Sequence, residues 1–232
     1  PAHERFTLAL VKDKPWSGYN YYQGNAASKI EINTDLPIRI DRAVDLGCHE
    51  GYPGHHAYNV LLESQLVRRR GWWEFSVLPL YSPFALIAEG TANFGVEVAF
   101  TRTERLALLR ETLFPLAGLD PSEAERYDRV NEAVSRLGHA GDEIARRYVD
   151  GRLSAAEAAT WYQRFTLMER ARAEQRVRFV ERYRAYTVNY TLGEDLVRAY
   201  VERNGGTEDQ PALRWQLFSQ LLTTPRVPST LS

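Results

Sequence analysis

The sequence has few of the residues that would tie it to disulfides, to nucleic acid or to a membrane. Its 232 residues include one cysteine, Cys48, so an internal disulfide is excluded. Its 29 basic and 30 acidic side chains nearly cancel, which argues against a nucleic-acid partner or an anionic membrane surface. No apolar run is long enough to predict a membrane span, and no signal-peptide pattern opens the chain. The compartment stays open: cytoplasmic, or secreted or periplasmic if a signal peptide was removed.

The length and the first residue bear on domain organisation. At 232 residues the chain is long enough to bury a core of its own. It begins with Pro1 and has no initiator methionine. We interpret this as the removal of a segment, or as a fragment of a longer protein.

Hydrophobic patterning predicts a mainly α protein with a small β element near its N-terminus. Residues 6–11 and 29–33 have the pattern of strands, and the aromatic- and glycine-rich stretch 16–23 between them that of a loop. Ser154 and Glu157 form the clearest helix-starting signal, a capping box. We expect helices at about 42–49, 57–70, 84–109 (one or two), 120–149, from 154, 168–186, 193–203 and 210–222.

Histidine is scarce but concentrated. Three of the five histidines, His49, His55 and His56, lie within eight positions, and Glu50 directly follows the first. A His-Glu pair followed by another imidazole is how zinc hydrolases place two nitrogen ligands and a general base around one ion. The sequence therefore predicts a Zn²⁺ site in which Glu50 acts as the base.

The spacing of these histidines does not fit a regular helix. Zinc requires ligand nitrogens about 3–3.5 Å apart. On a helix, residues six apart point about 120° away from each other, and residues seven apart are separated by about 10 Å along the axis. Pro53 breaks a helix and Gly54 permits a tight turn, so a bulge at 52–54 can absorb the extra residues. Either His55, which we favour, or His56 is then the second ligand.

A third ligand is expected from the helical run 85–93. Glu89 is the carboxylate in this otherwise apolar stretch, and its small neighbours allow a second helix to approach closely. Asn93 and Glu97 follow at i+4 and i+8, roughly on the same face. We expect either of them to hydrogen-bond the far nitrogen of a ligating histidine.

Three tyrosines near the C-terminus, Tyr183, Tyr186 and Tyr190, are expected mostly to pack. A tyrosine hydroxyl can also stabilise a transition-state oxyanion, so one of them is a candidate for that role.

The run from His49 to His56 resembles the H-E-x-x-P-G-H-H signature of the bacterial family called domain of unknown function 885, whose members look like gluzincin-type zinc metallopeptidases. Glu89-Gly90-Thr91-Ala92 matches the family's E-G-x-A element. Tyr190-Thr191-Leu192-Gly193 is similar to its tyrosine/glycine element, which makes Tyr190 the candidate catalytic tyrosine. The stretch 29–33 looks like the extended segment that precedes the His-Glu helix.

For the metal, the resemblance implies His49, one of His55 or His56, and Glu89 as ligands, with Glu50 as base. Family members are usually much longer. The chain thus looks either like a single catalytic domain over 1–232 or like the C-terminal portion of a larger helical metallopeptidase, whose N-terminal segment is missing or is a separate chain.

For the substrate, the resemblance implies a cleft lined by the strand 29–33, so Ile30, Ile32 and Asn33 are expected to bind an extended peptide. Thr91, where an aromatic residue is expected, and Ala57-Tyr58 depart from the family pattern and leave substrate preference open.

The leading hypothesis is a zinc-dependent metallopeptidase. Two alternatives are a zinc hydrolase of non-peptide amides or esters, and a non-catalytic binding protein whose helices a metal organises. The substrate is accordingly a peptide or a small amide.

Overall fold

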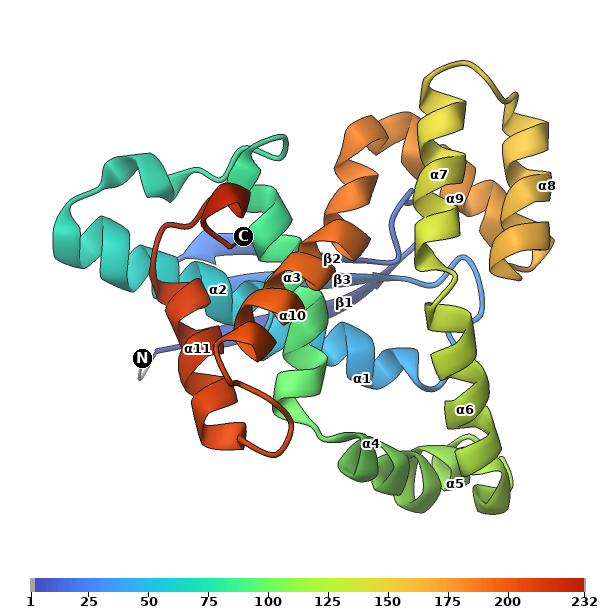
Figure 1. The fold of residues 1–232 in the computed structure, drawn as a ribbon, viewed down its shortest axis with the longest axis horizontal. Helices are drawn as coiled ribbons and strands as arrows, with labels where there is room; N and C mark the ends of the chain where they lie inside the picture. Colours follow the sequence, from blue (N-terminus) through green and yellow to red (C-terminus); the bar gives the residue numbers. More distant parts are fainter. Residues whose placement is uncertain (1–2, 232) are drawn as a thin grey trace.

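A computed structural model describes residues 3–231 and confirms a mainly α fold (Figure 1). Turns of π or 3₁₀ helix extend several helices, including Gly47–Gly51, Glu63–Arg68, Leu109–Leu113 and Arg184–Val188. The α-helices are α1 (Arg42–Leu46), α2 (His55–Leu62), α3 (Pro83–Ala99), α4 (Arg102–Leu108), α5 (Phe114–Leu116), α6 (Ala124–Ser135), α7 (Gly138–Val149), α8 (Ala155–Thr166), α9 (Arg170–Tyr183), α10 (Asn189–Arg203) and α11 (Pro211–Thr223).

The β element is a three-stranded sheet in the order β1-β3-β2, formed by β1 (Arg5–Val11), β2 (Gly18–Gly24) and β3 (Ala27–Asn33). The central strand β3 runs parallel to β1 and antiparallel to β2. Both strands predicted from the sequence are present. The loop predicted at 16–23 is wrong, because most of it is β2: pairing with β3 stabilises a segment whose Gly18 and Asn20 have low strand propensity.

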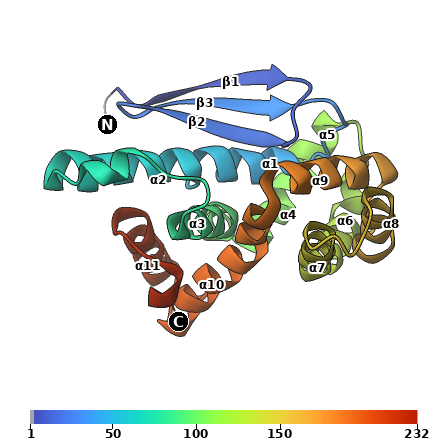
Figure 2. The ribbon, with the colours of Figure 1, turned by 90° about the horizontal axis from the view of Figure 1, so that it is seen from above.

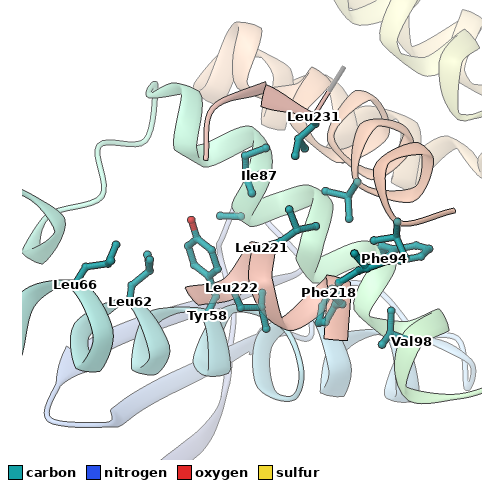
Figure 3. Packing of buried hydrophobic residues seen from close by; sticks show 14 residues of the cluster. Tyr58, Leu62, Leu66, Ile87, Phe94, Val98, Phe218, Leu221, Leu222 and Leu231 are labelled. Carbon is teal, nitrogen blue, oxygen red and sulfur yellow. The ribbon is translucent and has the colours of Figure 1, made fainter. Parts of the chain in front are cut away.

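The elements form layers. The sheet covers one side of a helical rod made of α1, the turn Gly47–Gly51 (hereafter the π turn), α2 and the turn Glu63–Arg68, while α3, α10 and α11 lie on the other side (Figure 2). A hydrophobic core fills the space between α2, α3, α10 and α11 (Figure 3). Among its members are Tyr58, Leu62 and Leu66 of the rod, Ile87, Phe94 and Val98 of α3, Val197 and Val201 of α10, and Phe218 and Leu221 of α11.

The predicted break in the rod occurs where the sequence places it. The π turn ends at Gly51, and α2 restarts at His55. In between, the Gly54 amide donates to the Cys48 carbonyl over 2.9 Å. A Cβ atom on Gly54 would lie 2.0 Å from the carbonyl oxygen of His49, so only glycine allows this approach. The break therefore changes the direction of the side chains that follow it.

Helices α3 and α10 cross at two glycines. A Cβ on Gly90 would lie 2.2 Å from the carbonyl oxygen of Gly193, and one on Gly193 would lie 2.4 Å from the carbonyl oxygen of Leu86. The backbones consequently approach more closely than any side chain would allow. This crossing brings the start of α10, with Tyr190, against the segment of α3 that carries Glu89.

Several remaining helices differ from the predicted boundaries. Helix α10 begins at Asn189, before the expected start at 193, and a π turn (Leu109–Leu113) and α5 continue beyond the expected end at 109. The α-helix expected over 57–70 begins two residues earlier and passes into a π turn at Glu63. The helix expected over 120–149 is divided into α6 and α7. No helix within residues 3–231 combines the length and the apolar character needed to span a membrane.

Candidate metal centre

Three potential ligands converge from three different elements. His49 lies on the π turn, His55 is the first residue of α2, and Glu89 lies in the middle of α3. The two imidazole Nε2 atoms are 3.3 Å (His49) and 3.4 Å (His55) from the nearest Glu89 carboxylate oxygens. One ligand atom from each of the three residues lies within 4.8 Å of the other two. This group can hold a metal ion.

The geometry fits an ion of the size of zinc. Ligand atoms about 2.0–2.2 Å from a tetrahedral ion lie about 3.2–3.5 Å apart, which matches the two Nε2–oxygen separations. The Glu89 Oε2 atom is buried and makes no hydrogen bond. A buried carboxylate oxygen without a partner is costly, and an ion would remove that cost.

The charges of the ion-free site are strongly coupled. Burial raises the pKa of Glu89, but the adjacent His55 and His49 outweigh it and hold this pKa well below its usual value. Burial lowers the pKa of His55, but the Glu89 carboxylate opposes this and raises it to about 9. The site thus attracts positive charge, either a proton on His55 or a metal ion.

The other candidate ligand, His56, points away from this group. Its Nδ1 lies 2.7 Å from the Ser28 hydroxyl, and its Nε2 lies 3.3 Å from a carboxylate oxygen of Glu4. The ring is fully buried against Phe6 and Tyr52. Adjacent residues on a helix differ by about 100° in direction, so only one of the two histidines can face α3. The structure selects His55.

Asn93 holds His49 as predicted. Its Oδ1 lies 2.9 Å from His49 Nδ1, and its Nδ2 donates to the carbonyl of Tyr190 over 3.0 Å. Since the Asn93 oxygen can only accept, His49 carries its proton on Nδ1 and leaves the Nε2 lone pair for a ligand.

The prediction that Glu97 hydrogen-bonds a ligating histidine is wrong. Its carboxylate pairs with Arg198 of α10, and it lies 3.5 Å from Arg214 of α11. One further turn of α3 carries Glu97 past the histidines and into this arginine cluster.

Glu50 lies beside the candidate ligands. Its side chain is buried, and Oε2 makes no hydrogen bond. The backbone carbonyl of Glu50 accepts from Asn20 Nδ2 over 2.6 Å, which fastens the π turn to β2. A Cβ on Gly18 would lie 2.8 Å from Glu50 Oε1, so the glycine makes room for the carboxylate. Glu50 is therefore held in place by its backbone and has a free oxygen.

One cavity of about 350 Å³ joins these groups. His49, Glu50, His55 and Glu89 all line it. Further lining comes from β2, from the loop before α3, and from α9 to the start of α10, in particular Trp16, Tyr19, Tyr21, Tyr22, Leu78, Leu80, Phe179, Tyr183, Tyr186 and Tyr190.

Two tyrosines of this cavity contact the candidate ligands. Tyr190 places its ring nearly parallel to that of His49, with 6.3 Å between ring centroids. Tyr186 donates its hydroxyl to Glu89 Oε1 over 2.5 Å. Burial and the negative charge of Glu89 raise the pKa of Tyr186, which keeps it a donor. The sequence indicated Tyr190 but not the hydrogen bond from Tyr186 to Glu89. The 3₁₀ turn between α9 and α10 determines which tyrosine hydroxyl reaches Glu89.

The prediction that Ile30, Ile32 and Asn33 bind an extended substrate is wrong. Ile30 and Ile32 are buried against Leu46, and Asn33 Nδ2 donates to the carbonyls of Lys14 and Trp16. Both edges of β3 are already paired, so no peptide can add to it. The cavity is lined by the edge strand β2, whose only sequence signal was its run of aromatic residues.

Comparison with known proteins adds nothing to this geometry. No family model matches the sequence, and no curated protein or solved structure matches the chain.

Proposed function

We propose that the protein is a zinc-dependent metallopeptidase with Glu50 as its general base. The observation that carries this proposal is that two features occur together in one cavity. A two-histidine, one-carboxylate group of zinc-ligand geometry lies beside a buried glutamate oxygen that has no partner. A purely structural metal site has no need for such a carboxylate, whereas hydrolysis does.

His49, His55 and Glu89 would hold the metal. Three protein ligands are the usual number at a catalytic zinc, because the remaining position stays open. Zinc in such a site supplies Lewis acidity, which lowers the pKa of water and polarises a carbonyl group.

Glu50 supplies the proton transfer. Its free oxygen accepts a proton from water and later delivers that proton to the leaving amine. The hydrogen bond from Asn20 to the Glu50 carbonyl holds the backbone that carries this carboxylate. Tyr190, beside His49, is our candidate donor to the oxyanion that develops on the substrate carbonyl.

The edge strand β2 suits a peptide substrate. It lines the cavity, and its outer edge is not paired within the sheet. An extended peptide can add to such an edge as a further strand through repeated main-chain hydrogen bonds, for which a small non-peptide amide or ester has no backbone. The sequence motifs agree with this proposal, and we propose that the chain is the catalytic portion of a protein related to domain of unknown function 885.

The test is a screen of the full chain, purified without chelators and loaded with zinc, against a library of fluorogenic peptides. Wild type is expected to cleave members of the library. Glu50→Gln is expected to keep its metal and lose activity by at least 100-fold, whereas the control Glu111→Gln, at an exposed glutamate outside the cavity lining, keeps both. A Glu50→Gln variant with full activity would show that the base is misassigned. A protein that binds zinc and cleaves nothing would be a binding protein.

A further inference from the structure

The cavity has aromatic walls on two sides. On the side of the sheet, Trp16, Tyr19 and Tyr21 form a continuous row, with ring centroids 5.6 Å and 4.5 Å apart. The segment from α9 to α10 contributes a second row. Its members are Phe179, Tyr183, Tyr186 and Tyr190, with successive centroid distances of 4.7, 6.1 and 5.9 Å. Both rows line the same cavity as the candidate ligands.

The charge of the lining is one-sided. Its acidic members are Glu50 and Glu89, and its lining residues include no lysine or arginine. Away from the ligand group and the ion it would bind, a carboxylate in the cavity would therefore meet no cation of the lining and would lose its hydration among rings. A substrate that places an uncharged group there avoids this desolvation cost.

An aromatic side chain is the group that these walls accommodate best. Aromatic pairs prefer offset-stacked or edge-to-face contacts at centroid distances of about 4.5–7 Å, and the two rows in the lining offer such faces and edges to a guest ring. Burial raises the pKa values of Tyr19 and Tyr183, so their hydroxyls stay neutral.

Resting on the proposed peptidase function, we infer that this cavity is a specificity pocket for an aromatic residue next to the scissile bond. The same aromatic rows disfavour an acidic side chain at that position. Tyr21 is the best residue through which to test the pocket. It is 40% exposed, its ring centroid lies 4.5 Å from that of Tyr19, and it is neither a candidate ligand nor a partner of one.

The first experiment compares cleavage of matched peptides by the zinc-loaded full chain. The peptides differ only at one position beside the scissile bond, which is Phe, Leu or Glu. We expect kcat/KM for the Phe peptide to exceed that for the Glu peptide by at least tenfold. Tyr21→Leu is expected to reduce the Phe-to-Leu ratio severalfold, with metal content unchanged. The control Trp73→Leu, which alters an aromatic residue that is 72% exposed and outside the cavity lining, is expected to leave the ratio unchanged.

The second experiment measures binding without turnover. The same uncleaved peptides are titrated by calorimetry into zinc-loaded Glu50→Gln protein, where the Phe peptide is expected to bind at least tenfold more tightly than the Glu peptide. Equal binding of the Phe and Glu peptides, or tighter binding of the Glu peptide, overturns the specificity pocket. Preferential binding of the Phe peptide together with no cleavage by wild type supports the pocket and refutes the peptidase. Cleavage without preference refutes the pocket alone.

Discussion

Asn93 Oδ1 lies 2.9 Å from His49 Nδ1 and determines which nitrogen of that imidazole faces Glu89. The amide is itself oriented by donating to the carbonyl of Tyr190, so one side chain connects α3, the π turn and α10. The ligand geometry at His49 therefore depends on a contact outside the ligand set.

We predict that Asn93→Ala lowers zinc affinity by about 10- to 100-fold, because the His49 ring loses the partner that fixes its tautomer and direction. Competition with a chromophoric chelator measures this. The control Asn204→Ala removes an exposed amide at the end of α10 and is expected to leave affinity unchanged. An Asn93→Ala protein that binds zinc like wild type would show that His49 is positioned by the backbone alone.

The two tyrosines next to the site are predicted to act differently. Tyr186→Phe removes the hydrogen bond to Glu89 Oε1 and is expected to weaken zinc binding by about tenfold. Tyr190→Phe is expected to keep zinc affinity and to lower kcat by about 100-fold, as loss of an oxyanion donor does. Chelator competition and steady-state kinetics on both variants separate the two roles. Equal effects of the two substitutions on metal affinity would argue that Tyr190 is also a positioning residue.

The raised pKa of His55 predicts how the ion-free protein responds to pH. The folded-state pKa of about 9 lies above the ordinary value of 6.5, so protonated His55 stabilises the fold below about pH 6.5, and this contribution is lost as pH rises through 9. Urea unfolding of ion-free wild type and His55→Gln from pH 6 to 10 measures the difference between them, which should shrink across that window. A difference that is independent of pH would contradict the coupling of His55 to Glu89.

The same proton competes with the metal. Because His55 must be neutral to bind an ion, zinc affinity is expected to increase with pH up to about 9 and to level off above it. Metal titrations at fixed ionic strength measure this dependence. An affinity that levels off near pH 6.5 would indicate that Glu89 does not hold the proton on His55.

The crossing of α3 and α10 is predicted to be intolerant of a single methyl group. Gly90→Ala and Gly193→Ala each place a Cβ within 2.4 Å of backbone atoms, so we expect each to reduce the free energy of unfolding by about 1–3 kcal/mol or more. Gly47→Ala is the control. It is helical, no atom lies within 4 Å of its added Cβ, and alanine is favoured there by up to about 1 kcal/mol. Urea unfolding curves compare the three. Wild-type stability in Gly90→Ala would mean that the helices lie further apart.

The parts of this fold that could be predicted from the sequence are those with local causes. The break before His55 follows from Pro53 and Gly54, and the start of α8 follows from the Ser154 capping box, which is present in the structure. Glu89 could be selected because it is a carboxylate in an apolar helical run. Each of these signals lies within a few residues of the feature that it predicts.

The parts that could not be predicted depend on partners distant in sequence. His56 is turned away from the site by Ser28 and Glu4, and Glu97 by Arg198. Strand β2 exists because β3 pairs with it, and that pairing also removes β3 from the cavity. The spacing of residues within a segment does not indicate contacts of this kind. The positions of these side chains therefore depend on how the sheet and the helices pack together.

The central claim is that His49, His55 and Glu89 hold one zinc ion with Glu50 beside it. A crystal of the zinc-loaded protein, measured on both sides of the zinc absorption edge, tests this most directly. We predict one anomalous peak about 2.0–2.2 Å from His49 Nε2, His55 Nε2 and a Glu89 oxygen. An anomalous peak at His56 would contradict the account. So would a protein that is fully loaded with zinc but shows no anomalous peak between these three residues.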